Sequence, residues 1–124
     1  MKKHLFLLCI VSMLSSCSSD ENELENPIIG TWQQIDLIIN NQSSDSECIE
    51  KNTITFNSDF SLRWLRHTQP NCNLDDGGYT GTWEKIDDTN YSLRTDENFI
   101  LTKNGNEISI QESNNNSRTW IFKK

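Results

Sequence analysis

The sequence predicts an all-β fold, and three observations support this. From residue 29 onward, apolar and polar side chains alternate in short segments, which is the pattern of strands with one dry and one solvated face. Clusters of Gly, Asn, Asp and Ser separate these segments, as turns do in all-β proteins. No segment has helical spacing of its apolar residues, and 124 residues leave room for one small domain.

The first sixteen residues have the features of an export signal. Lys2 and Lys3 precede the apolar run 5–14, which is too short to cross a bilayer as a helix. The run ends in Leu14-Ser15-Ser16-Cys17, which resembles the bacterial lipobox. The resemblance implies removal of residues 1–16 as a lipoprotein signal peptide and acylation of Cys17, giving a permanent membrane anchor. An ordinary secretory signal with a nearby cleavage site is the alternative.

Residues 17–27 are expected to form the lipidated Cys17 and an acidic flexible tether. The stretch 18–26 is polar and carries four acidic residues, so it lacks the apolar content needed to order itself. Acidic residues directly after a lipidated cysteine resemble the export signal of some surface-exposed Gram-negative lipoproteins, and a solvated linker fits equally well. We therefore expect a lipid-anchored cell-envelope protein at the outer membrane, with surface exposure as one possibility.

The exported chain is strongly acidic. Loss of Lys2 and Lys3 leaves nine Lys and Arg against 18 Asp and Glu, a formal charge of −9. Nucleic-acid binding requires clustered basic residues, so this charge argues against a nucleic-acid partner. It also gives the domain no electrostatic reason to lie flat on anionic lipid. We therefore expect the domain to stand off from the membrane.

Eight segments are predicted to be strands: 30–39, 53–57, 60–67, 79–86, 90–94, 98–103, 107–111 and 118–123. Short polar turns join most of them, including Asn104-Gly105, the dipeptide favoured in two-residue hairpins. Strand alternation assigns one shared face to the apolar residues Ile54, Phe56, Phe60, Leu62, Trp64, Tyr79, Trp83, Tyr91, Leu93, Phe99, Leu101, Ile108, Ile110, Trp120 and Phe122. Such a sheet either closes into an up-and-down barrel or folds into two stacked sheets.

The cysteines predict one disulfide. Cys9 leaves with the signal and Cys17 carries the lipid, so Cys48 and Cys72 remain in an oxidising compartment. A redox or metal-binding pair is the alternative, but the sequence has neither a C-x-x-C spacing nor clustered histidines. We therefore expect Cys48 and Cys72 to form a structural bridge.

Two Gly-Thr-Trp tripeptides stand at the start of predicted strands, at residues 30–32 and 81–83. The first resembles the Gly-x-Trp opening of lipocalins and fatty-acid-binding proteins. Over residues 14–124, the order of lipobox, acidic spacer, two early loop cysteines, second tripeptide and final Lys-Lys is similar to small lipocalin-like domain lipoproteins. The resemblance implies an antiparallel meander of about eight strands that closes into a lipocalin-like β-barrel over 28–124. It also implies that Arg118 packs over Trp32.

The interior of such a barrel decides between two functions. Eight strands enclose just enough space for their own side chains or for one small ligand. If a ligand binds, we expect Trp64, Tyr79, Trp83 and Tyr91 to contact a small apolar or amphipathic molecule. If the ten aromatic side chains of the exported chain fill the interior, the barrel acts as an envelope interaction or structural module through its loops. The domain is expected to be a monomer.

Catalytic and metal chemistry are not expected. His67 is the single histidine after residue 16, and no Ser or Cys nucleophile combines with it and a carboxylate in a recognisable arrangement. The segment 71–82 loosely resembles a calcium-binding loop, but its sixth position is Asp76 instead of Gly and its twelfth is Thr82 instead of Glu. The sequence therefore predicts a protein that is not an enzyme and has no cofactor or metal.

Overall fold

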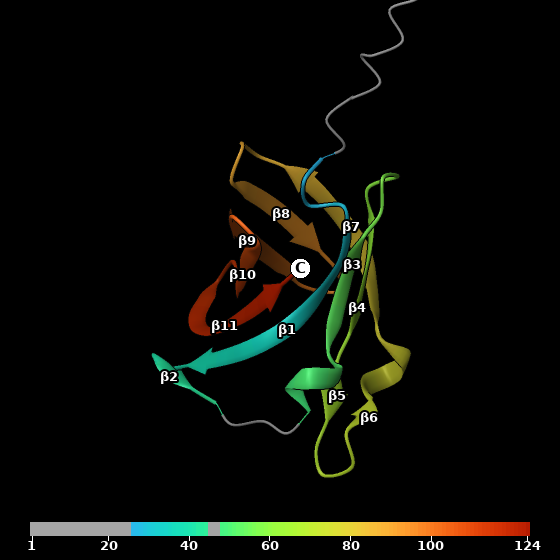
Figure 1. Ribbon diagram of the computed structural model, residues 1–124, viewed down its shortest axis with the longest axis vertical. Helices are drawn as coiled ribbons and strands as arrows, with labels where there is room; N and C mark the ends of the chain where they lie inside the picture. Colours follow the sequence, from blue (N-terminus) through green and yellow to red (C-terminus); the bar gives the residue numbers. More distant parts are fainter. Residues whose placement is uncertain (1–25, 45–47) are drawn as a thin grey trace, which may run out of the picture.

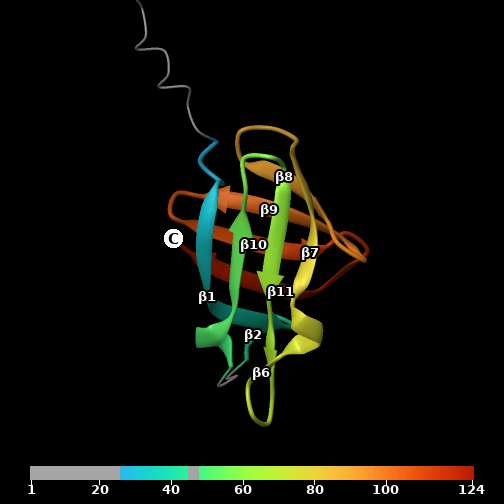
Figure 2. The same ribbon diagram turned by 90° about the vertical axis from the view of Figure 1, so that its right-hand side faces the viewer.

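A computed structural model describes residues 26–44 and 48–124. The predicted signal peptide, Cys17 and the predicted tether as far as residue 25 lie outside the described residues. Figures 1 and 2 show a closed antiparallel barrel. Its eight strands are β1 (Gly30–Ile39), β3 (Thr53–Phe56), β4 (Ser61–Leu65), β7 (Tyr79–Lys85), β8 (Asn90–Arg94), β9 (Asn98–Asn104), β10 (Glu107–Glu112) and β11 (Asn115–Lys123).

The barrel closes because β1 pairs with both β3 and β11. Each other strand pairs with its sequence neighbour in the barrel, so the sheet is the up-and-down meander that the sequence predicts. This confirms the predicted all-β barrel and excludes the alternative of two stacked sheets. The eight predicted segments correspond to the eight barrel strands, with ends that differ by up to three residues.

The two long loops contain short elements that the sequence did not predict. Strand β2 (Gln42–Ser43) pairs with the end of β1, and β5 (His67–Thr68) pairs with β6 (Asn73–Leu74). The loops also hold two 3₁₀ helices, η2 (Ile49–Lys51) and η3 (Asp75–Gly77). Within residues 26–44 and 48–124, neither of these helices has the length to cross a bilayer.

The two ends of the barrel differ in what they carry. We call one the tether end: it comprises residues 26–29, the turns 57–60, 86–89 and 105–106, and Lys124. The opposite end, here the far end, carries the β5–β6 pair, η2, η3 and the turns 95–97 and 113–114. Figure 1 shows residues 26–29 in blue at the upper end of the barrel and β5–β6 at the lower end.

A β-bulge in β1 turns this strand from one face to the other. The register with β11 shifts between Gln34 and Asp36. As a result, Trp32 and Gln34 point inward, Ile35 is exposed, and Leu37 packs against the core. The extra residue at the bulge explains why the alternation of this segment is weaker than that of the other strands.

The buried amide of Gln34 belongs to a polar network that fastens a loop to the barrel. The Asn52 side chain donates to Gln34 Oε1 (2.9 Å), and Gln34 Nε2 donates to the carbonyl of Asp36 (3.0 Å). The backbone N–H of His67 donates to Asn52 Oδ1 (2.7 Å). Because each buried amide finds a partner, the network avoids the cost of burying polar groups.

The predicted disulfide is confirmed. Cys48 and Cys72 are bonded, and their Cα atoms lie 5.2 Å apart. The bridge joins the loop before η2 to the turn between β5 and β6. It therefore holds together the two long loops of the far end.

The prediction that Phe60 points inward is wrong. Its side chain is 58% exposed, and β4 begins only at Ser61. Phe60 has a positive φ of 68°, so the chain is still turning there and the strand alternation does not yet apply. The remaining predicted inward residues of β3 and β4 are buried.

The prediction that Arg118 packs over Trp32 is also wrong. Arg118 pairs with Ile39 at the other end of β1. The cation over the Trp32 ring is instead the ammonium of Lys124, 5.3 Å from the ring centroid. Lys124 Nζ also donates to the carbonyl of Ile29 (2.6 Å). The mistake arose because the sequence alone does not give the register between β1 and β11.

The two contacts of Lys124 should contribute measurably to stability. We expect Lys124→Ala to lower the free energy of unfolding by about 1 kcal/mol, because it removes a cation–π contact and a hydrogen bond. The matched change Arg118→Ala should stay within about 0.5 kcal/mol of the unmodified domain. Urea denaturation of the two variants measures both values. A larger loss for Arg118→Ala than for Lys124→Ala would contradict the assignment.

The turn between β7 and β8 is held by the side chain of Asp87. The Asp87 carboxylate accepts hydrogen bonds from the Asn90 side chain and from the backbone N–H groups of Thr89 and Asn90. These bonds, the Asn90 side chain first, lower the pKa of Asp87 from its ordinary value of 3.8 to about 2. A carboxyl with a depressed pKa stabilises the fold above its unfolded-state pKa and loses this effect as pH falls through the folded value.

We therefore expect Asp87→Ala to reduce stability at neutral pH and to approach the unmodified domain as pH falls. The difference in urea midpoint should be constant above about pH 5 and shrink as pH falls toward about 2. Glu84→Ala is a control from the neighbouring strand, on an exposed side chain. A difference for Asp87→Ala that does not change with pH would show that ionisation of this carboxyl does not support the turn.

The glycines of the two Gly-Thr-Trp tripeptides serve different purposes. Gly30 has a positive φ of 124°, and a Cβ there would lie 3.0 Å from Lys124 Cε. Gly81 lies in β7, where a Cβ would lie 2.0 Å from the carbonyl oxygen of Arg94 in β8. The first glycine therefore permits an unusual backbone conformation, whereas the second permits close approach of two strands.

Candidate functional site

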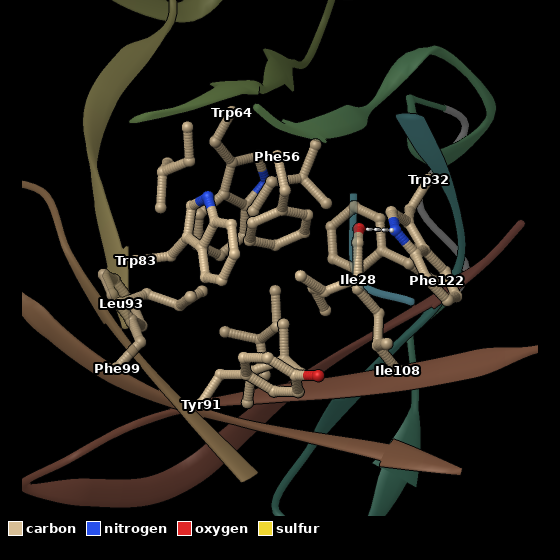
Figure 3. Packing of buried hydrophobic residues seen from close by; sticks show 14 of the residues in the cluster. Ile28, Trp32, Phe56, Trp64, Trp83, Tyr91, Leu93, Phe99, Ile108 and Phe122 are labelled. Atoms are coloured by element: carbon tan, nitrogen blue, oxygen red, sulfur yellow. Dashed lines mark hydrogen bonds between the residues drawn. The ribbon is translucent and has the colours of Figure 1, made fainter. Parts of the chain in front are cut away.

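The barrel interior is the candidate site that the sequence predicts, and Figure 3 shows its aromatic and aliphatic side chains packed in one cluster. The ring contacts centre on two tryptophans, Trp83 and Trp64. Trp83 contacts Phe56, Phe60 and Tyr91, with ring centroids 6.4, 5.0 and 6.1 Å apart. Trp64 contacts Phe99, Trp120 and Phe122 at 5.3, 5.3 and 5.9 Å. Most of these pairs meet edge to face, the arrangement that aromatic rings prefer.

The four predicted ligand-binding residues are divided between these two groups of ring contacts. Trp83 and Tyr91 belong to the group with Phe56, and Trp64 belongs to the other. Tyr79 pairs with Trp64 across β4 and β7 and is only partly buried. The exposed fractions of Trp64, Trp83 and Tyr91 are 1%, 4% and 0%. These side chains therefore fill the interior together with their aliphatic neighbours, as a barrel of this size allows.

The polar groups of three predicted residues are used by the chain itself. Trp83 Nε1 donates to the carbonyl of Asn57 (3.0 Å), and the Tyr79 hydroxyl donates to Asp75 Oδ2 (2.7 Å). The Tyr91 hydroxyl donates to Asn26 Oδ1 (2.9 Å). Burial raises the pKa of Tyr91, so this hydroxyl remains protonated and able to donate. A ligand would have to displace these internal partners in order to use the same groups.

Trp64 is different. Its Nε1 is a buried side-chain polar atom without a hydrogen-bond partner in the described part of the chain. Buried N–H groups normally have an acceptor, so this one is a candidate contact for a bound molecule. Trp64 lies next to the far-end terminus of β4, the strand that leads into β5.

Arg66 covers this end of the interior. The central carbon of its guanidinium lies 5.5 Å from the Trp64 ring centroid, 5.3 Å from that of Tyr79 and 5.5 Å from that of Trp120. A cation over three rings is held by their negative faces. Sequence reasoning did not select this residue. One signal could have found it, because Arg66 continues the inward parity of Leu62 and Trp64.

Two adjoining hollows lie on the outside of the barrel wall near the far end. One has a volume of about 450 Å³ and is lined by β7, β8, β9 and the turn at Ser113 and Asn114. The other, of about 370 Å³, is lined by Asp96, Glu97, Asn98, Glu112 and Asn114. In the described ranges, no three His, Cys, Asp or Glu side chains are placed to hold a metal ion. The larger hollow is lined by Trp83, Leu93 and Phe99 as well as by polar residues, whereas the lining of the smaller one is polar and acidic.

Comparison with known proteins supports the fold. The barrel is similar to the crystal structure of a DUF4847 family protein from Bacteroides vulgatus. The TM-score is 0.51 at 13% sequence identity, and the match covers 77% of this chain and 92% of the other. No family of related sequences and no curated protein matches the chain. At this identity the likeness concerns the small β-barrel fold alone.

Proposed function

We propose that this protein is a lipid-anchored lipoprotein of the cell envelope whose filled barrel acts as an interaction or structural module. The observation that carries the proposal is the filled interior, because a barrel occupied by its own side chains has its surface and loops left for contact with partners. The 0% to 4% exposure of Trp64, Trp83 and Tyr91 supports this choice over a ligand carrier.

The arrangement of the two ends fits such a module. The chain reaches the barrel at the tether end, where Asn26 bonds to Tyr91. The disulfide-linked loops and the two outer hollows lie at or near the far end. An anchor on Cys17 would leave these far-end features free to contact a partner protein in the envelope.

Native mass spectrometry of the protein isolated from its own envelope tests the proposal. We expect the mass of the acylated chain from Cys17 onward, without a bound small molecule. Cys17→Ala should release the protein from membranes. A variant that stays membrane-bound would contradict the anchor, and a stoichiometric small-molecule adduct would contradict the filled-barrel module.

A small amphipathic ligand is the second candidate function, and the unpartnered N–H of Trp64 favours it. An acceptor on such a ligand would meet this N–H after Arg66 moved away from the rings at the far end. Titration with a fluorescent fatty acid tests this candidate. Saturable binding that Trp64→Phe abolishes and Trp32→Phe leaves intact would establish it and would overturn the filled-barrel module.

A further inference from the structure

The tether end exposes two large apolar side chains on neighbouring turns. Phe60 is 58% exposed and Ile86 is 57% exposed, more than the other large apolar side chains of the described residues. The β3–β4 turn is bonded to the strand that leads into the β7–β8 turn, because the backbone N–H of Trp83 in β7 donates to the carbonyl of Phe60 (2.9 Å). In both Figures 1 and 2 the β3–β4 and β7–β8 turns lie at the same end of the barrel as residues 26–29.

Phe60 has a positive φ, a backbone conformation that is unfavourable for a bulky residue. The Phe60 N–H donates to the carbonyl of Asn57 (3.1 Å), and the Asn57 N–H donates to the carbonyl of Ser61 (2.9 Å). In this kind of hairpin the residue with positive φ is usually Gly, and a bulky residue there is a genuine outlier. Strained residues concentrate at functional sites. The Phe60 ring contacts Trp83 on one side, yet most of it stays exposed. A bulky exposed side chain at a strained backbone position therefore points to a further contact outside the barrel.

The charge of the tether end also differs from that of the whole domain. Residues 28–124 contain nine Lys and Arg and 14 Asp and Glu. Four of each belong to the tether end or the adjoining strand ends: Lys85, Lys103, Lys123, Lys124, Asp59, Asp87, Asp88 and Glu107. The remaining five basic and ten acidic residues give the rest of the domain a charge of −5. The tether end is thus the part that anionic lipid headgroups repel least.

We propose that the tether end lies against the lipid bilayer, with Phe60 and Ile86 among the headgroups. The inference rests on the proposed anchor at Cys17. The nine residue steps from Cys17 to Asn26 span at most about 30 Å, so the anchor keeps this end near the bilayer. The bond between Asn26 and Tyr91 fixes which end that is. This arrangement differs from the expectation, drawn from net charge, that the domain stands off.

Fluorescence quenching in the full lipidated chain tests the orientation. One fluorophore is attached at Ser58→Cys in the tether-end turn and, in a second sample, at Asn114→Cys in a far-end turn. The protein is reconstituted into vesicles of phosphatidylethanolamine and phosphatidylglycerol that contain a spin-labelled lipid. We expect quenching at position 58 and none at 114. The pair Phe60→Asn and Ile86→Asn should abolish the quenching at 58.

Matched variants keep the test specific. Asn adopts positive φ more readily than Phe, so Phe60→Asn keeps the turn. The control pair Leu74→Asn and Ile100→Asn removes two exposed apolar side chains away from the tether end and should leave quenching unchanged.

Equal quenching at 58 and 114, in protein that floats with the vesicles, would overturn the orientation alone. Protein that does not float would overturn the anchor as well. A concentration-dependent spectral shift at 58 without lipid would identify a second copy as the occupant and overturn the proposal.

Discussion

Gly81→Ala is expected to be the most damaging small substitution in the barrel. The added Cβ would lie 2.0 Å from the carbonyl oxygen and 2.9 Å from the carbonyl carbon of Arg94. These are backbone atoms, so β7 and β8 would have to separate and lose hydrogen bonds of the Thr82–Arg94 and Glu84–Ser92 region. We expect a loss of at least about 3 kcal/mol in the free energy of unfolding, measured by urea denaturation.

Two control variants separate crowding from other effects of glycine replacement. Gly105 has a positive φ of 62°, but a Cβ there meets no atom within 4 Å. Gly105→Ala should therefore cost only about 1 kcal/mol, from its backbone conformation. Thr82→Ala, on an exposed side chain beside Gly81, should change stability by less than about 0.5 kcal/mol. A cost for Gly81→Ala no larger than that for Gly105→Ala would contradict the close approach of β7 and β8.

Loss of the disulfide is expected to have an effect of similar size. Cys48 and Cys72 are 24 residues apart, and the bond restricts a loop of this length in the unfolded chain. The chain-entropy estimate gives about 3–4 kcal/mol, a large share of the stability of a small domain. The double variant Cys48→Ala and Cys72→Ala should unfold at a lower urea concentration than the oxidised domain. The reduced unmodified domain should behave like the double variant.

The disulfide also restrains the two long loops of the far end. If oxidised and reduced proteins unfold at the same urea concentration, the bridge does not contribute to global stability. Limited proteolysis then gives an independent measurement, because the bridge joins the two long loops. We expect reduction to accelerate cleavage within residues 40–52 and 66–78 and to leave the hairpin turns at the tether end unchanged.

The strand pattern was predictable from the sequence because it depends on local alternation. Tyr91 and Leu93, or Ile108 and Ile110, identify the buried face of a strand without knowledge of any neighbour. Closure into a barrel followed from sequential hairpins and one dry face, with the lipocalin-like resemblance choosing between the two architectures. Short elements such as β5 and β6 were missed because two-residue strands carry no periodic signal.

The errors and omissions concern properties that alternation does not encode. Phe60 was misplaced because its backbone φ depends on the turn that the chain adopts. Arg118 was chosen over Lys124 because the pairing of Trp32 depends on the register across a bulge. Asn52 and Arg66 were missed because their partners are distant or lie on other strands. The candidate site residues Trp64, Trp83 and Tyr91 were correctly predicted to point inward. Alternation could not show how completely they are buried, and it is this burial that argues for a filled barrel.

Closure through β1 and β11 brings Ile29 and Lys124 into contact at one rim. A circular permutant is therefore feasible, with a short linker from residue 124 to residue 28 and new ends opened between Ser113 and Asn114. All eight barrel strands would remain intact in this molecule. A lipid anchor attached to its new N-terminus would hold the barrel upside down, with the disulfide-linked loops toward the bilayer. Comparing the two orientations in cells would reveal which rim the envelope needs to face outward.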